Sequence, residues 1–126
     1  MGSVRDALED AAEYPQANPW YRAVYADDEP IGFVMLSWDV EPQPPEIIGP
    51  WFLWKLLIGE RHHGQGYGRE VVRHVADLVR AERATEILTS YVDAPGGPAG
   101  FYERLGFVPT GDRDADDEII VRLPLR

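Results

Sequence analysis

The chain has 126 residues and a net charge of -10, and 44% of its residues are hydrophobic. This size and composition predict one globular domain over residues 1–126, and the acidic balance argues against nucleic-acid binding while remaining compatible with a cationic substrate. Cysteine is absent, which excludes disulfides and cysteine nucleophiles. Because there is also no apolar run of membrane-spanning length and no leader pattern, we expect a cytosolic protein.

The N-terminal part of the chain predicts one helix followed by a pair of strands. Ser3 caps the helix Ser3–Glu13, with Asp6 three residues later, and Pro15 follows its end. Residues 1–19 are therefore interpreted as a helix and linker, and residues 20–126 as the core. The apolar stripe of the helix comprises Val4, Ala7, Leu8, Ala11 and Ala12. Two strands, Trp20–Ala26 and Ile31–Trp38, flank an acidic turn at 27–30, and the proline-rich stretch Val40–Pro50 predicts a loop.

The second half of the chain alternates strands with helices. The apolar run Trp51–Ile58 is typical of a central strand that is covered on both faces. A helix follows, with Val71, Val72, Val75, Leu78 and Val79 on one side. The remaining elements are a strand at Glu86–Val92, a short helix that stops at Gly106, and a closing hairpin of Phe107–Thr110 and Glu118–Leu123. The order α-β-β-β-α-β-α-β-β predicts an α+β fold with a mixed sheet.

Residues Arg61–Arg69, with the sequence RHHGQGYGR, form a glycine-rich turn between the central strand and the next helix. Glycines at alternate positions allow backbone N–H groups to converge, and the helix N-terminus adds unpaired donors and the positive end of its dipole. This combination predicts a diphosphate site. A dinucleotide fingerprint would need Gly in place of Arg69, and a P-loop would need Lys followed by Ser or Thr. The remaining alternative is a turn that binds no ligand.

Two motifs in this order resemble those of the GNAT superfamily of acyl-CoA-dependent N-acetyltransferases. The first, Arg/Gln-x-x-Gly-x-Gly/Ala between a strand and a helix, is matched by Arg61–Gly66. The second, an aromatic-Tyr pair on a short helix that ends in Leu-Gly-Phe, is matched by Phe101–Phe107. The resemblance implies a mixed, mostly antiparallel sheet flanked by helices. Within the superfamily, the stretch from Phe52 to Gly68 is similar to the bacterial spermine/spermidine (diamine) acetyltransferase-like branch.

The resemblance implies acetyl transfer from acetyl-CoA to a primary amine, such as a polyamine or diamine, by direct attack. Tyr102 would be the catalytic acid for the leaving thiolate, because a phenol with a pKa of about 10 is protonated at neutral pH. The alternative is a tyrosine that only packs in its helix. The backbone of Ile58 would pair with the pantetheine arm. The expected cofactor-binding residues are Leu56, Ile58, Arg61, His63, Gly64, Gln65, Gly66, Tyr67, Gly68 and Arg69.

The sequence does not identify the base that takes the proton of the amine. Glu46, Glu60 and Asp93 lie near the ends of the central strands and are equal candidates. His62 and His63 are adjacent in a tight turn and are not expected to converge on one ion, so no metal site is predicted. The acidic run Asp112, Asp114, Asp116, Asp117 and Glu118 predicts a solvated hairpin tip.

Two features depart from the family pattern. Fewer than twenty residues precede the strand at Trp20, so the first strand and one helix of the family are expected to be missing. A second copy of the chain would then cover the exposed sheet edge, which predicts a homodimer. Pro95 stands where many relatives have an asparagine that contacts the pantetheine. A non-catalytic acetyl-CoA-binding domain, or a truncated fragment without a complete acceptor site, is therefore the alternative to an active enzyme.

Overall fold

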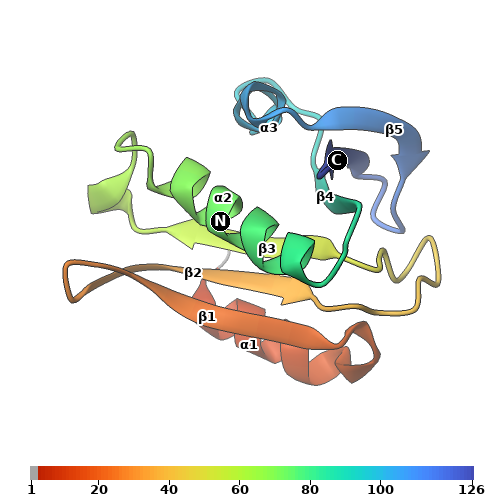
Figure 1. Cartoon of the computed structure of the whole chain (residues 1–126), viewed down its shortest axis with the longest axis horizontal. Helices are drawn as coiled ribbons and strands as arrows, with labels where there is room; N and C mark the ends of the chain where they lie inside the picture. The colour runs from red at the N-terminus through yellow and green to blue at the C-terminus, as the bar shows by residue number, and fades with distance from the viewer. Residues whose placement is uncertain (1–2) are drawn as a thin grey trace.

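The computed structural model describes residues 3–126, so residues 1–2 of the predicted domain lie outside the described part (Figure 1). The predicted order of helices and strands is confirmed, with short 3₁₀ turns added at Pro15–Ala17 and Glu60–His62. The helices are α1 (Val4–Glu13), α2 (Tyr67–Ala81) and α3 (Ala99–Leu105). The strands are β1 (Pro19–Ala26), β2 (Glu29–Ser37), β3 (Phe52–Ile58), β4 (Glu86–Tyr91), β5 (Val108–Arg113) and β6 (Ile119–Pro124). None of these helices is long and apolar enough to cross a membrane.

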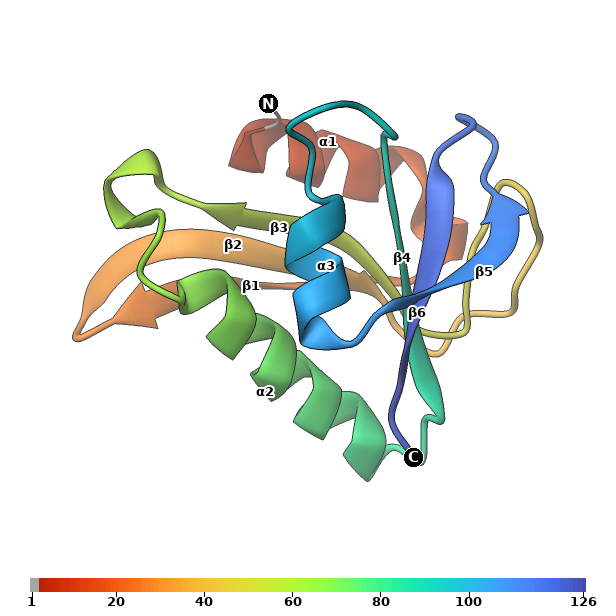
Figure 2. The same ribbon diagram turned by 90° about the horizontal axis from the view of Figure 1, so that it is seen from above.

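The six strands form one sheet in the order β1-β2-β3-β4-β6-β5, and every neighbouring pair except β3 and β4 is antiparallel. β3 and β4 are parallel and pair only at Phe52–Leu88 and Leu53–Thr89. Beyond these positions the two strands diverge (Figure 2). The mixed, mostly antiparallel sheet flanked by helices confirms the predicted fold class.

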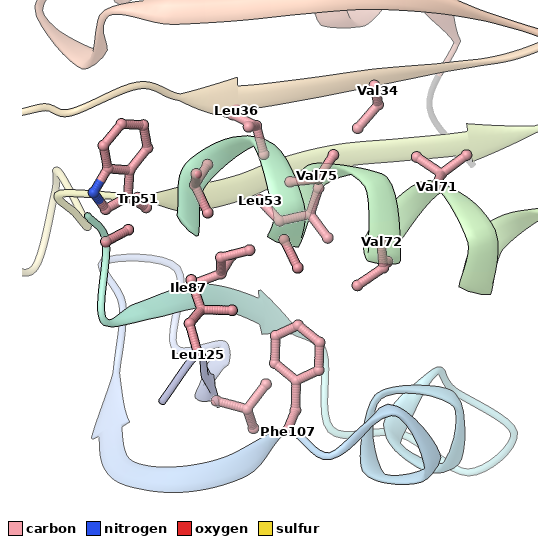
Figure 3. Packing of buried hydrophobic residues seen from close by; sticks show 14 residues of the cluster. Val34, Leu36, Trp51, Leu53, Val71, Val72, Val75, Ile87, Phe107 and Leu125 are labelled. Carbon is pink, nitrogen blue, oxygen red and sulfur yellow. The ribbon is translucent and has the colours of Figure 1, made fainter. Parts of the chain in front are cut away.

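Helices cover both faces of the sheet, with α1 on one side and α2 and α3 on the other (Figure 2). Alternate residues of β2 belong to these two sides, because Val34 and Leu36 pack in the cluster under α2, whereas Phe33 and Met35 pack against α1. The cluster under α2, drawn in Figure 3, has more buried residues than the one against α1. Its members include Leu53, Val71, Val72, Val75, Val79, Ile87, Phe107 and Leu125. The two sides are called the α1 face and the α2 face below.

Four apolar positions that the sequence predicts to face the core are exposed. Leu78 of α2 is 46% exposed, and Val4 and Leu8 of α1 are 44% and 40% exposed. In α2, Ala76 is buried and Leu78 is not. The side of the helix that packs on the sheet includes Ala76, whereas Leu78 lies at its edge. In α1 only Ala7 and Ala11 are buried, and Ala12 is exposed. The predicted cap is confirmed, since the side chains of Ser3 and Asp6 each accept a hydrogen bond from the other residue's backbone N–H.

The turn between β1 and β2 is shorter than predicted. Only Asp27 and Asp28 form it, with φ values of 48° and 70°. Aspartate tolerates this left-handed conformation better than most residues. Glu29 and Pro30 consequently belong to β2 rather than to the turn. The other predicted elements differ from the observed ones by a few residues at their ends.

Candidate active site

The candidate site lies where β3 and β4 separate. Leu53 and Thr89 are the last paired residues of the two strands, and the Thr89 hydroxyl donates a hydrogen bond to the Leu53 carbonyl oxygen at 2.8 Å. Thr89 is only 2% exposed, so this bond is made away from solvent. This hydrogen bond lies at the end of the paired part of the two strands. The rest of β3, residues 54–58, has no partner in β4.

The backbone of Leu56 and Ile58 faces this unpaired side of β3. The N–H of Gly59 donates to the Ile31 carbonyl at 2.7 Å, which continues the register of Ile58 with Gly32. Because hydrogen-bonded and non-hydrogen-bonded pairs alternate in an antiparallel ladder, Leu56 and Ile58 turn their N–H and C=O groups away from β2. An extended chain can therefore pair with this edge as a further strand. One group is already engaged, since a ring nitrogen of His63 lies 2.6 Å from the Ile58 carbonyl oxygen.

The glycine-rich turn leads from this edge into α2. Gly64 and Gly66 have φ values of 75° and 84°, the left-handed region that favours glycine. Gly66 is the N-cap of α2, and no side chain caps the helix. The N–H groups of the first helical turn, including those of Tyr67 and Arg69, therefore lack a capping side chain. Such a helix start, with the positive end of its dipole, favours an anion.

The other predicted cofactor-binding residues surround this turn. Arg61 and Arg69 are exposed, and neither forms an ion pair within residues 3–126. The Gln65 side chain donates a hydrogen bond to the Arg61 carbonyl oxygen at 3.3 Å. The structure thus brings the ten predicted residues together along the end of β3 and the start of α2.

The two adjacent histidines have different partners. His62 lies 3.5 Å from the Glu29 carboxylate and meets the ring of Tyr67 edge-on at 6.0 Å, whereas His63 bonds Ile58. Among residues 3–126 no three His, Asp or Glu side chains are arranged to hold a metal ion.

Gly68 has a packing function besides its predicted place near the cofactor. A Cβ atom at this position would lie 3.2 Å from Cζ of Phe101. Glycine therefore lets the start of α2 approach α3 closely. Because Phe101 directly precedes Tyr102, this contact helps to fix the position of Tyr102.

Tyr102 lies beside the end of the paired strands, on the α2 face. Its ring stacks on Tyr91 at 6.0 Å and meets Phe101 and Phe107 edge-on, each at 5.2 Å. Burial raises the pKa of Tyr102 above its ordinary value, the nearby Thr89 hydroxyl lowers it, and the negative charge of Glu118 raises it further. The phenol therefore keeps its proton at neutral pH, as a general acid must.

A cavity of about 400 Å³ occupies the α1 face of the same strands. Its walls come from α1, the loop 40–50, β3, β4 and the tip of the β5–β6 hairpin, and the N–H of Ala115 at that tip donates to the Pro45 carbonyl at 3.0 Å. The polar and aromatic residues that line it are Asp10, Tyr14, Ser37, Glu46, Phe52, Trp54, Lys55, Ser90, Asp114, Asp116 and Glu118. The cavity therefore combines aromatic surface with five carboxylates and one ammonium group.

An irregularity in β3 shapes this cavity. The pairing of β2 with β3 shifts between Met35 and Leu36, which leaves Trp54 as an extra residue between Leu53 and Lys55. Such a bulge redirects side chains locally. As a result, the successive residues Trp54 and Lys55 both line the cavity. The Lys55 ammonium group lies 3.3 Å from the Asp10 carboxylate of α1.

The acidic hairpin tip is only partly solvated, which corrects the prediction. Asp112, Asp116 and Asp117 are exposed, but Asp114 and Glu118 are half-buried. The Asp114 carboxylate accepts hydrogen bonds from the N–H groups of Asp116 and Glu118 at 2.9 and 3.0 Å. The sequence does contain a signal for Glu118, because it directly precedes the apolar run that forms β6 and so lies beside the sheet rather than at the outer end of the hairpin.

The structure separates the three candidate bases. Glu46 lines the cavity, whereas Glu60 and Asp93 do not. Glu118, which the sequence does not single out as a base, also lines it, and its carboxylate accepts a hydrogen bond from the Ser90 hydroxyl at 3.3 Å.

Comparisons with known proteins agree with this geometry. Residues 2–107 match the model of the acetyltransferase (GNAT) family. The chain is 30% identical over 103 residues to the peptidyl-lysine N-acetyltransferase YjaB of Salmonella typhimurium, covering 82% of this chain and 59% of that protein. It is 30% identical over 115 residues to the protein of the same name from Escherichia coli, covering 90% and 66%. The chain thus spans less than two thirds of the length of either relative.

Solved structures share the fold. A GNAT family acetyltransferase from Elizabethkingia anophelis with acetyl-CoA bound has a TM-score of 0.69 at 16% identity, covering 92% of this chain and 82% of that one. The family model, which matches most of the chain, and the two relatives lead to one conclusion. The chain belongs to the GNAT family of acetyltransferases.

Proposed function

We propose that this chain transfers the acetyl group of acetyl-CoA to an aliphatic primary amine by direct attack. The observation that carries this proposal is the position of the Tyr102 phenol, whose pKa is raised by burial, beside the Thr89–Leu53 hydrogen bond where β3 and β4 part. A proton donor at that point would serve a leaving group delivered between the two strands. The alternative role, a tyrosine that only packs, does not require a hydroxyl at this position.

The residues around the diverging strands fit acetyl-CoA. The free backbone groups of Leu56 and the N–H of Ile58 are suited to an amide-containing arm that lies along β3. Gly64, Gly66 and the start of α2 present N–H groups suited to a diphosphate, and Arg61 and Arg69 add positive charge beside it. His63 would lengthen or lose its bond to the Ile58 carbonyl if an arm paired with that carbonyl.

The chemistry divides between the cosubstrate and the protein. When bound, acetyl-CoA supplies a thioester that an amine attacks, with the CoA thiolate as the leaving group. Tyr102 would donate its proton to the leaving sulfur and recover a proton from solvent. The ring contacts of Tyr102 with Tyr91, Phe101 and Phe107 would hold the phenol in place and limit the access of water to it.

The acceptor that we propose carries a primary ammonium group. The acidic cavity on the α1 face, with its aromatic wall, suits a positively charged alkyl chain. A polyamine or diamine is the acceptor predicted from the sequence. A lysine side chain of a peptide is a second candidate, favoured by the two relatives described as peptidyl-lysine acetyltransferases.

We also propose a homodimer, supported by the position of β1 at one edge of the sheet with no further strand in the described part of the chain. The exposed rings of Tyr21 and Tyr25 on this edge strand would pack in such an interface. Sedimentation equilibrium at micromolar concentration would give twice the mass of the chain if the proposal is correct, and the single mass would contradict it. The cytosolic location remains a prediction.

One assay tests the enzyme against the non-catalytic alternative. Release of CoA thiol would be measured with acetyl-CoA and, in separate reactions, spermidine, 1,4-diaminobutane, a lysine-containing peptide, an aminoglycoside and free amino acids. We expect release with at least one amine. Binding of acetyl-CoA by calorimetry, without release in any reaction, would favour the non-catalytic domain. Release with the peptide alone would replace the polyamine by lysine as the acceptor.

A further inference from the structure

The candidate acid and the acidic cavity lie on opposite faces of one short segment of β4. Thr89 and Ser90 are consecutive strand residues, so their side chains point to opposite faces of the sheet. Thr89 lies beside Tyr102 on the α2 face, and Ser90 lines the cavity on the α1 face. The Ser90 hydroxyl donates a hydrogen bond to the Glu118 carboxylate. Tyr102 on the α2 face and Glu118 on the α1 face are thus both held next to the point where β3 and β4 part.

Glu118 is the carboxylate of the cavity best placed to meet an amine at that point. It directly precedes β6, whose Ile119 pairs with Tyr91 at the end of β4. It is hydrogen-bonded to Ser90, the residue that follows Thr89 in β4, and its negative charge raises the pKa of the Tyr102 phenol. Its Oε1 accepts from Ser90, which leaves Oε2 free to accept from a ligand.

The other carboxylates of the cavity are engaged or exposed. Asp10 forms an ion pair with Lys55. Asp114 accepts the two backbone hydrogen bonds that shape the hairpin tip. Glu46 and Asp116 are exposed on the rim. Within the described part of the chain, Glu118 is therefore the half-buried carboxylate of the cavity that forms neither an ion pair nor backbone hydrogen bonds with the hairpin tip, and the inference does not depend on the number of acidic groups.

We propose that Glu118 is the catalytic base of the acetyl transfer and that it receives the ammonium group of the acceptor from the cavity on the α1 face. This step rests on the acetyl transfer proposed above. The ammonium group gives one proton to the Glu118 carboxylate, and the freed nitrogen forms a bond to the acetyl carbon while the carbon–sulfur bond breaks. Tyr102 gives its proton to the sulfur, the nitrogen loses its second proton to solvent after the attack, and the Tyr102 phenolate takes one proton back from solvent. The net products are the amide, the CoA thiol and one proton, which leaves Glu118 for solvent.

The charges that face Glu118 favour this role. Asp114 and Asp116 act on it from the hairpin and Lys55 from β3, while the Tyr102 phenol is uncharged at neutral pH. Burial is the largest effect on the pKa of Glu118 and raises it, the two aspartates raise it further, and Ser90 and Lys55 lower it. A carboxylate with a raised pKa is a better base than an ordinary one, because the best catalytic pKa lies near the working pH.

The test compares Glu118→Gln with Asp112→Asn, which makes the same charge change on the same hairpin but outside the cavity. We would determine kcat/KM from the release of CoA thiol at pH values from 5.5 to 9, with the amine that the wild type uses best. We expect E118Q to lose roughly 100-fold in kcat/KM, in line with the usual contribution of a general base, and to lose the acidic limb of the profile. Glu118→Asp should retain part of the activity. D112N should stay within about twofold of the wild type.

A second measurement does not require turnover. Titration calorimetry with 1,4-diaminobutane should show binding to the wild type and D112N, and at least tenfold weaker binding to E118Q. Circular dichroism would establish that each variant is folded. Equal rates and pH profiles for E118Q and wild type would overturn the catalytic role, and equal diamine affinity, or none in the wild type, would overturn the ammonium site. If acetyl transfer itself is wrong, thiol release is absent for every protein while the calorimetric difference between E118Q and D112N remains.

Discussion

The hydroxyl of Thr89 donates a hydrogen bond to the carbonyl oxygen of Leu53, 2.8 Å away, at the last position where β3 and β4 pair. A parallel ladder would normally continue along both strands. Here the Thr89 side chain takes the last hydrogen bond of the ladder, and the backbone of β3 beyond Leu53 has no partner on the side that faces β4. The same threonine lies beside Tyr102, so one residue links the end of the ladder to the candidate acid.

Thr89→Val should destabilise the protein by about 1–3 kcal/mol, because the buried Leu53 carbonyl loses a partner while the shape of the side chain is nearly kept. The free energy of unfolding would be measured in urea. Thr110→Val is the matched control, since its hydroxyl also donates to a carbonyl, that of Ile120 at 3.0 Å, but at a half-exposed site where water can replace it. A loss for T110V as large as that for T89V would contradict the importance of burial at the end of the ladder.

Tyr102→Phe should lower kcat by about 100-fold to 10,000-fold, the usual range for a general acid, with little change in the affinity for acetyl-CoA. The ring contacts with Tyr91, Phe101 and Phe107 are kept, so only the proton donor is removed. Thiol-release kinetics and calorimetry with acetyl-CoA would measure the two quantities. Tyr91→Phe removes a neighbouring hydroxyl that has no proposed role and should leave kcat nearly unchanged. Wild-type turnover in Y102F would remove Tyr102 from the mechanism.

Local patterns are sufficient to predict most of the fold. The apolar period distinguishes strands such as Trp51–Ile58 from helices such as the one at Val71–Val79, and Ser3 and Gly106 identify where two helices begin and end. Period alone does not give the width of the surface that a helix buries. Leu78 is therefore exposed although it lies close to the apolar side of α2.

The two halves of the candidate site differ in how far they can be predicted. The glycine turn and the Tyr102 helix are each short and continuous, so the first can be found from its spacing and the second from its resemblance to a family motif. The cavity is assembled from α1, the loop 40–50, two central strands and the β5–β6 hairpin. The neighbourhood of Glu46 and Glu118 depends on the contact of Ala115 with Pro45, seventy residues apart in sequence. No local pattern encodes that contact, and for this reason the sequence predicts a solvated acidic tip.

Gly66→Val should weaken acetyl-CoA binding at least tenfold. The φ of 84° at the N-cap of α2 costs a side chain about 1–2 kcal/mol, so the backbone would rotate and its N–H groups would no longer converge. No atom lies closer than 3.8 Å to a Cβ placed at Gly66, so the effect would come from the backbone and not from a clash.

Gly111→Val is the control for this prediction. Gly111 has a φ of 91°, and a Cβ atom at this position would have no atom within 4 Å, but Gly111 lies in β5, away from the turn. Both variants should lose similar stability in urea, and only G66V should lose acetyl-CoA affinity in calorimetry. Unaltered affinity in G66V would count against the diphosphate site.

The raised pKa of Glu118 also predicts how stability depends on pH. Between the ordinary pKa of a glutamate and the raised pKa of Glu118, the folded state binds more protons than the unfolded state. The stability contributed by Glu118 is therefore fully present below the ordinary value and is lost as the pH rises through the raised one. Glu118→Gln cannot titrate, so its free energy of unfolding should lack this decrease, and at neutral pH E118Q should be the more stable protein.

Urea unfolding of both proteins at intervals from pH 4 to 8 would measure the difference. Glu9→Gln, which removes an exposed carboxylate on α1, should follow the wild-type curve within that window. Parallel curves for E118Q and wild type would mean that Glu118 titrates normally and is an ordinary surface carboxylate. A gain in stability together with a loss of turnover in E118Q is the combination expected of a carboxylate that is half-buried for catalysis rather than for folding.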